Sequence, residues 1–310
     1  MVLGIDTASV AGNKTVDWAK AKANGIAFAI IRGAYGTAKD KNFDRDWPAM
    51  KQAGVVRGAY LFLRFPYEGR PAPTPKAQAE AICKFVGKLD SCDLPISLDI
   101  EFPGDGRKST WLDPATKKPM SAKQLLDGAH EAWDVLYTNY GVAPLTYSSA
   151  RVWLDDLLNL PAPWATESLL WLAKYNFSAG PAVLNPGNVT NPPVPPPWAG
   201  SDPTPIKYRN TPYSNDNFAF HQFQGNATGC PGFPSGNVDM NRFRPIQKGA
   251  NGEKVKWVQR RLGFTGKDVD GKFGPMTDRA VRNLQAGEND VVADGIIGPR
   301  TLAYLCWMNP

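Results

Sequence analysis

Two acidic residues separated by one position end an apolar segment of the chain. The segment reads LPISLDIE and closes on Asp99 and Glu101. Because side chains alternate along a strand, both carboxylates are expected on the same face, with Cβ atoms roughly 6–7 Å apart. Flexible side-chain tips can close this to about 5–5.5 Å, the carboxylate separation of retaining glycosidases. Such a pair raises one pKa, so one group can stay protonated while the other stays ionised.

Two further acids stand at predicted strand ends. Asp6 closes the first apolar run, and Asp239 lies in the last one. In a closed barrel the first and last strands are neighbours, and the carboxyl ends of the parallel strands carry the active site. A single aspartate at a strand end is often only a turn former or an N-cap. Taken together with Asp99 and Glu101, they predict a ring of carboxylates at one opening of a barrel.

Aromatic side chains stand near the same strand ends and could stack on the apolar faces of sugar rings. They are Tyr35, Tyr60, Phe62, Tyr147 and Tyr175. Packing in the core or at the barrel rim is the alternative role for each. Tyr60 and Tyr175 are the preferred sugar contacts, because they stand at predicted strand ends.

The scarcity of histidine narrows the chemistry further. The chain has two, His130 and His221, far apart and without the HExxH spacing of a zinc hydrolase or a nucleophile-elbow motif nearby. The cysteines form no CxxC motif and are expected to be free thiols, with a Cys83–Cys92 bridge as the alternative; they are Cys83, Cys92, Cys230 and Cys306. We therefore expect chemistry based on carboxylates, with no metal and no cofactor.

The elements that position the acids alternate along the chain. Eight apolar runs are predicted as strands, mostly continuous, which indicates a sheet buried on both faces. They span Val2–Asp6, Ala27–Arg32, Arg57–Leu63, Pro95–Ile100, Pro144–Ser148, Leu169–Tyr175, Phe218–Phe223 and Asn237–Met240. Helical patterns separate the early strands, at Asp17–Asn24, Asp44–Ala53, Thr74–Leu89 and Ser121–Tyr140. This order predicts an α/β barrel or open sheet, with fewer helices after Ser149.

One connection between predicted strands is rich in proline. Residues 181–205 hold nine of the 28 prolines. Such a segment favours polyproline II and cannot form a helix or a central strand. We interpret it as a loop insertion in the first domain, with a domain linker as the alternative.

A short repeat marks a second domain. DGKFGPMT at Asp270–Thr277 recurs as DGIIGPRT at Asp294–Thr301. Proline after glycine suits the first position of a helix, so each copy is expected to begin one. Together with an amphipathic stretch at Glu253–Leu262, the repeat predicts three helices. The expected division is a barrel over 1–243, a linker over 244–251 and a helical domain over 252–310.

The chain has a formal net charge of +6, and residues 244–310 carry most of it, with eleven Lys or Arg against seven Asp or Glu. A basic surface suits an anionic partner, although it can also be only a solvated face. No nucleic-acid-binding signature is present, so nucleic acid is not expected. The chain shows no apolar run long enough for a membrane helix and no signal-peptide pattern. We expect synthesis in the cytoplasm, with a secreted enzyme trimmed to its mature form as the alternative, and no membrane partner.

Ordered motifs give the chain a family resemblance. It contains GIDTAS, FAIIRGAYG, RGAYLFLR, LPISLDIE, LTYSS, WLAKY, FHQFQ and NVDMN over residues 1–243. This series resembles glycoside hydrolase family 25, the lysozymes or N-acetylmuramidases. Residues 246–306 resemble the peptidoglycan-binding domain 1 family through the DGxxGPxT repeat. The combination is similar to phage endolysins, which act on the bacterial wall after release from the host cytoplasm.

The resemblance implies a flattened TIM-like (β/α)5(β)3 barrel followed by a small three-helix all-α domain. It implies hydrolysis of the β-1,4 bond between N-acetylmuramic acid and N-acetylglucosamine of peptidoglycan, with retention, by a protein expected to be a monomer. Glu101 matches the general acid/base. Asp99 matches the partner that stabilises an N-acetyl-assisted or a covalent intermediate. Asp6 and Asp239 match the flanking acids.

The resemblance also extends to binding residues. Gln222 matches the amide of the family's Trp-Gln pair, although His221 replaces the tryptophan. Leu61 and Tyr35 replace a usual histidine and a usual acid, which leaves the sugar contacts open. Wall contacts are expected at the turn residues of the repeats, Asp270, Gly271, Gly274, Asp294, Gly295 and Gly298.

Two alternatives stay open at this point. One is a non-catalytic wall-binding protein on a glycosidase scaffold, which the intact set of acids argues against. The other is a chitinase-like glycosidase, which also uses a DxE pair on a barrel strand. Its longer DxxDxDxE pattern is absent, because Cys92, Pro95 and Ser97 occupy the corresponding positions.

Overall fold

The computed structural model of the chain describes residues 2–67, 70–101, 112–113, 115–149, 151–158, 160–173 and 218–308. The proline-rich segment 181–205 and the predicted sugar contact Tyr175 lie outside these residues. Among the described helices, none combines the length and the apolar character needed to cross a membrane.

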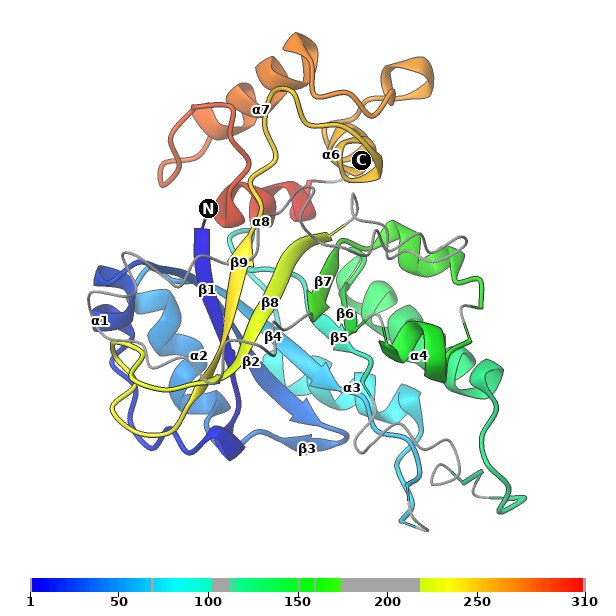
Figure 1. Cartoon of the computed structure of the whole chain (residues 1–310). Helices are drawn as coiled ribbons and strands as arrows, with labels where there is room; N and C mark the ends of the chain where they lie inside the picture. The colour runs from blue at the N-terminus through cyan, green and yellow to red at the C-terminus, as the bar shows by residue number, and fades with distance from the viewer. Residues whose placement is uncertain are drawn as a thin grey trace.

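The described strands form one sheet that closes into a barrel (Figure 1). They are β1 (Val2–Thr7), β2 (Ile26–Tyr35), β3 (Ala38–Lys39), β4 (Val56–Phe62), β5 (Ser97–Asp99), β6 (Leu145–Ser149), β7 (Leu170–Ala173), β8 (Phe218–Ala227) and β9 (Val238–Phe243). The order is β1-β9-β8-β7-β6-β5-β4-β2-β3, and a β1–β2 pairing closes the ring. Pairing is parallel from β1 through β2 and β4 to β8, whereas β9 is antiparallel to both β8 and β1. The expected neighbourhood of the first and last strands is therefore confirmed.

Helices cover the outside of the barrel between the early strands. They are α1 (Trp18–Ala23), α2 (Phe43–Gln52), α3 (Pro75–Val86) and α4 (Ala122–Tyr140). Local sequence signals explain their ends: Ser121 and Gln124 form a capping box at the start of α4, and Gly141, with φ 70°, ends it. After β6 the described cover consists only of a π-helical turn (Val152–Asp156) and a 3₁₀ turn (Pro163–Glu167), as the thinning of helices predicted.

Aromatic side chains fill the barrel interior. Phe28 packs edge-on against Phe220 at 5.2 Å between ring centroids, and Tyr147 packs against Trp171 at 4.5 Å. The interior is so full that a Cβ atom on Gly4 of β1 would lie 2.5 Å from the Phe28 ring. A packed interior leaves room for a site only at the ends of the strands.

The C-terminal residues form a small helical domain. It consists of α6 (Glu253–Arg261), a 3₁₀ turn (Gly266–Asp268), α7 (Pro275–Ala286) and α8 (Pro299–Trp307). Pro275 and Pro299 are the first residues of their helices, so the prediction that each repeat copy begins a helix is confirmed.

Helix α8 packs against the end of the barrel where the parallel strands begin (Figure 1). The Arg300 guanidinium donates to the carbonyl oxygens of Gly54 at 3.3 Å and Cys92 at 3.5 Å. The Trp307 indole N–H donates to the carbonyl oxygen of Asp93 at 2.7 Å. One continuous apolar cluster joins this end of the barrel to the helical domain. The helical domain therefore lies opposite the carboxyl ends of the strands.

Candidate active site

The four predicted acids come together at the carboxyl end of the barrel. Asp6 of β1 and Asp239 of β9 are directly opposed in the sheet. Both line a cavity of about 250 Å³, and Glu101 lines it as well, two residues beyond the end of β5. Asp99 is the last residue of β5 and is buried, and the charges of Glu101 and Asp6 both act on its carboxyl group. Distant segments thus meet here because the barrel closes.

Two buried amides hold Asp6. Gln222 Nε2 donates to Asp6 Oδ2 at 2.7 Å, and Asn241 Nδ2 donates to the same oxygen at 2.6 Å. The Tyr147 hydroxyl donates to Gln222 Oε1 at 2.9 Å, and the Trp171 indole N–H donates to Asn241 Oδ1 at 2.7 Å. Because these donors occupy the amide oxygens, both amide nitrogens must turn toward Asp6. Tyr147 and Trp171 in the barrel interior therefore orient the side-chain amides of Gln222 and Asn241.

Asp239 is held from the opposite side by a residue of β8 with a left-handed backbone conformation. Its Oδ1 accepts a 2.7 Å hydrogen bond from the backbone N–H of Asn226. Asn226 lies within β8 next to an irregular register and has φ 55°, in the left-handed region that asparagine tolerates. The Asn237 side chain donates to Asn226 Oδ1 at 3.1 Å and supports this conformation.

Burial and mutual repulsion keep these acids protonated more readily than in water. Burial, with a smaller contribution from the charge of Asp239, raises the pKa of Glu101 to about 7, and Arg151 opposes the shift. Burial and the charge of Glu101 raise the pKa of Asp99 well above its ordinary value. Burial raises the pKa of Asp6 well above its ordinary value, and Asp239 adds to it. Glu101 can therefore hold a proton near neutral pH and give it up in a reaction.

Asp99 also has a buried oxygen that is free to bind. Within the described residues its Oδ1 has no hydrogen-bond partner. A buried carboxylate oxygen without a partner costs free energy, which a donor group of a substrate can recover.

The predicted aromatic contacts take different positions. Tyr60 and Phe62 line the cavity beside the acids. Tyr35 is partly exposed at the rim, with its ring tilted by 39° against that of Phe62 at 4.9 Å between centroids, and with the Arg64 guanidinium 4.9 Å from its ring. Tyr147 is buried below the cavity, where it orients Gln222. Among these four described residues, Tyr60, Phe62 and Tyr35 lie at the cavity or its rim, and Tyr147 does not line the cavity.

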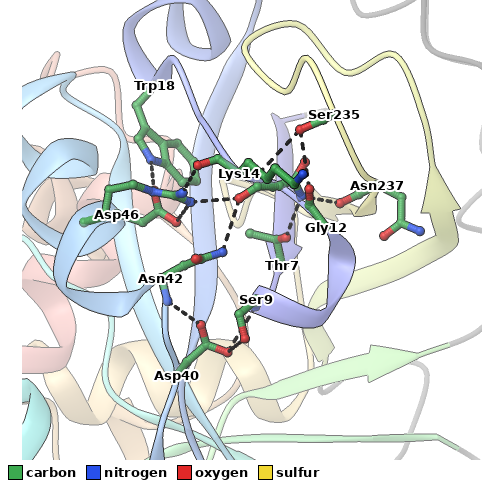
Figure 2. Close-up of polar contacts among 12 residues, drawn as sticks. Thr7, Ser9, Gly12, Lys14, Trp18, Asp40, Asn42, Asp46, Ser235 and Asn237 are labelled. Carbon is green, nitrogen blue, oxygen red and sulfur yellow. Dashed lines mark hydrogen bonds and ion pairs between the residues drawn. The ribbon is translucent and has the colours of Figure 1, made fainter.

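A charged network that the sequence did not reveal borders the cavity. Arg32 of β2 lines it and donates to Asp40 Oδ2 at 2.8 Å. The backbone N–H and hydroxyl of Ser9 donate to the same oxygen at 3.1 and 2.9 Å. Figure 2 shows Asp40 between Ser9 and Asn42. The network fixes the 3₁₀ turn (Ser9–Ala11) against the β2–β3 hairpin. An arginine at a strand end was the only sequence signal for it.

The β8–β9 loop closes the other side of the rim. Asn13 Nδ2 donates to the Thr7 hydroxyl at 3.2 Å and to the carbonyl oxygen of Asn237 at 2.6 Å; Figure 2 shows Thr7 and Asn237 on the two sides of this contact. Gly236 has φ 77°, and a Cβ atom there would lie 2.1 Å from the carbonyl oxygen of Ala11. Only glycine allows the two loops to approach this closely.

Within the described residues, no group of three or more His, Cys, Asp or Glu side chains is placed to hold a metal ion. Four cysteines are free thiols, so the Cys83–Cys92 bridge left open by the sequence does not form; they are Cys83, Cys92, Cys230 and Cys306.

The first turn of the repeat is built around a buried glutamine. Gln259 Nε2 donates to Asp270 Oδ1 at 2.8 Å, and its Oε1 accepts from the backbone N–H of Gly271 at 2.9 Å. Gly271 has φ 72°, and Gly274 caps α7. These contacts give the signature residues a role in shaping the turn, while their contact with the wall stays a prediction.

The second turn repeats this arrangement. Gln285 Nε2 donates to Asp294 Oδ1 at 3.2 Å, and its Oε1 accepts from the backbone N–H of Gly295 at 2.8 Å. Gly298 caps α8 as Gly274 caps α7. The glutamines lie outside the repeated motif, so no sequence pattern indicated their role.

Comparisons with known proteins identify the families of the two parts of the chain. The sequence profile of "Glycosyl hydrolases family 25" matches residues 5–189, and that of "Putative peptidoglycan binding domain" matches residues 251–305. The chain belongs to glycosyl hydrolase family 25 and carries a C-terminal putative peptidoglycan-binding domain. The predicted enzyme class, a glycoside hydrolase of the lysozyme type that acts on peptidoglycan, is confirmed at this level.

Individual relatives are distant. Lysozyme M1 of Streptomyces globisporus is 28% identical over 245 residues, which cover 78% of this chain and 67% of that protein. The uncharacterized protein YegX of Escherichia coli K12 is 27% identical over 166 residues, so the match spans about half of each chain, 52%. The bacterial lysozyme structure from Streptomyces coelicolor has a TM-score of 0.55 at 22% identity, covering 78% of this chain and 92% of that one. The last comparison shows the fold, and the predicted (β/α)5(β)3 class is confirmed.

Proposed function

We propose that this enzyme cleaves the β-1,4 bond between N-acetylmuramic acid and N-acetylglucosamine with retention, and that Glu101 is its general acid/base. The observation that carries the proposal is the position of Glu101. It lines the same cavity as Asp6 and Asp239, and burial raises its pKa to about 7. A carboxylic acid with such a pKa is suited to protonate a leaving group near neutral pH.

In the first step, the protonated Glu101 donates its proton to the glycosidic oxygen as the bond from that oxygen to the anomeric carbon breaks. Positive charge develops on the sugar, and Asp99 stabilises it, either through the N-acetyl group or as a covalent partner. The positive charge favours the ionised form of Asp99, which opposes the effect of burial on its pKa. In the second step, water attacks the anomeric carbon and gives a proton to the Glu101 carboxylate, as the bond from that carbon to the N-acetyl oxygen or to the Asp99 carboxylate breaks.

The flanking groups are proposed to bind and orient. Tyr60 and Phe62 offer apolar ring faces beside the cavity, and Tyr35 extends this surface at the rim. Tyr147 and Gln222 act indirectly, through the hydrogen-bond chain that orients Asp6. Tyr175 stays a proposed sugar contact because it stands at the end of a predicted strand.

The C-terminal residues are proposed to hold the enzyme on the wall. We propose the division into a barrel over 1–243, a linker over 244–251 and a wall-binding domain over 252–310, in a protein that acts as a monomer. The match to a putative peptidoglycan-binding domain over residues 251–305 supports this division. The positive charge of the same region suits the carboxylates of peptidoglycan.

The test is Glu101→Gln, which keeps the shape of the side chain and removes the transferable proton. We expect release of reducing ends from purified sacculi to fall by at least about 100-fold, as for loss of general acid catalysis. The control is Glu131→Gln, at an exposed position on α4, which should change little. Mass analysis of the products should show reducing N-acetylmuramic acid. Near-normal activity of the Glu101 variant, reducing N-acetylglucosamine, or freed stem peptides would contradict the proposal.

A further inference from the structure

The two copies of the repeat place equivalent helix positions in opposite environments. Pro299 and Ala303 of α8 are buried. Their counterparts in the first copy, Pro275 and Arg279 of α7, are exposed. The turns before both helices share the same glutamine-centred hydrogen bonds. The difference therefore comes from what packs on each helix.

The barrel occupies the outer face of α8. Arg300 and Trp307 both donate to backbone carbonyl oxygens in the segments that precede β4 and β5. Met276 is the counterpart of Arg300 in the first copy, and it is 55% exposed. Figure 1 shows α7 on the side of the helical domain that faces away from the barrel. The helix of the second copy, α8, thus packs against the barrel, and the equivalent face of α7 in the first copy is exposed.

The open surface combines cations with an apolar centre. We define the α7 face as Lys272, Pro275, Met276 and Arg279, all of which are exposed. In the part of the chain that the structure describes, neither Lys272 nor Arg279 takes part in a salt bridge, whereas Arg282 nearby pairs with Asp278 at 2.9 Å. The first two charges are therefore available to an anionic partner.

We infer that the α7 face binds the stem peptides of peptidoglycan through their carboxylates. This rests on the proposed function, that the C-terminal domain holds the enzyme on the wall. A stem peptide offers carboxylates for Lys272 and Arg279, and alanine methyl groups for Met276 and Pro275. A phosphodiester polymer of the wall would use the cations and leave the exposed apolar surface unmatched.

The experiment uses the full chain carrying Glu101→Gln, so that the sacculi stay intact, and measures binding by co-sedimentation. The test variant adds Lys272→Glu and Arg279→Glu. The control adds Arg260→Glu and Lys267→Glu, which make the same charge change at exposed positions elsewhere in the domain. We expect the α7-face variant to bind at least about tenfold more weakly and the control to change less than about twofold. Equal weakening by both variants would show a general charge effect and overturn the inference.

Two treatments of the sacculi identify the partner. Sacculi stripped of phosphodiester polymers with hydrofluoric acid should bind as well as untreated ones. Sacculi whose carboxylates are converted to amides should lose binding. Loss of binding on stripping would overturn the inference in favour of a phosphodiester partner. If the parent protein does not bind sacculi at all, the proposed wall-binding function fails as well, which separates the two failures.

Discussion

At the scale of single residues, Glu101 links the stability of the barrel to pH. Its pKa is raised from the ordinary 4.5 to about 7 in the folded protein. Between these values the folded state holds a proton that the unfolded state has lost. The stabilisation from this proton is therefore complete below about pH 4.5, and it is lost as the pH rises through about 7.

This linkage predicts that Glu101→Gln stabilises the protein at alkaline pH. A neutral amide has no charge to bury, so the variant should gain on the order of 2 kcal/mol over the parent at pH 8 and much less at pH 4. Urea unfolding at both pH values measures the difference. Glu131→Gln should show no such dependence. A gain of equal size at both pH values would mean that the charge of Glu101 is not the cause.

Residue types and spacing were enough to find the acids but not their supports. Asp6, Asp99, Glu101 and Asp239 were found because each stands at or near the end of an apolar run. The role of Asn241 could not be predicted, because it depends on a tryptophan from another strand, whose indole N–H donates to the side-chain amide oxygen of Asn241. Contacts between strands that are distant in sequence have no local signal.

At the scale of elements, the hydrogen bonds of the buried glutamines are expected to stabilise the helical domain. Replacing Gln285 with Met keeps the bulk of the side chain and leaves the backbone N–H of Gly295 without its partner. It also removes one of the two hydrogen bonds to the carbonyl oxygen of Ile296, which still accepts from the backbone N–H of Gly298. We expect a loss of about 2 to 4 kcal/mol in stability, measured by chemical unfolding of the full chain. Gln247→Met, at an exposed position, is the control. An equal effect of both substitutions would show that the hydrogen bonds do not matter.

Elements were predicted well where a pattern was long. The predicted helix Ser121–Tyr140 differs from α4 by one residue at its start. The hairpin strand β3 was missed, because its two residues are too short to show a pattern. The extension of β8 to Ala227 was also missed, because it passes through irregular register where alternation breaks down. Gln259 and Gln285 stand at different distances from their turns, so the repeat did not reveal them.

At the scale of the whole molecule, the contact between α8 and the barrel should hold the two domains in one arrangement. Arg300→Ala combined with Trp307→Phe removes three hydrogen bonds to the barrel backbone. We expect the two domains to separate, which raises the radius of gyration in solution scattering and lowers the unfolding temperature by about 2–4 °C. Met276→Ala, at the equivalent position of the open repeat copy, should change neither quantity. Unchanged scattering in the double variant would contradict a docked arrangement.

The packing of α8 against the barrel could not be predicted from the sequence. Arg300 and Trp307 contact backbone oxygens of Gly54, Cys92 and Asp93, and a carbonyl oxygen is the same for every residue type. The charge excess and the repeat indicated a second domain. They carried no information on where that domain would pack, because its position depends on the completed barrel.

The position of α8 has a consequence for how the enzyme would work on a wall. The helical domain covers the end of the barrel where the parallel strands begin, and the carboxylates lie at the opposite end. With the α7 face attached to a stem peptide, the catalytic opening points away from the point of attachment. The molecule then acts as a spacer that cuts glycan strands one molecular length from its anchorage. An enzyme arranged in this way can hydrolyse the surrounding glycan strands without cutting the strand to which it is bound.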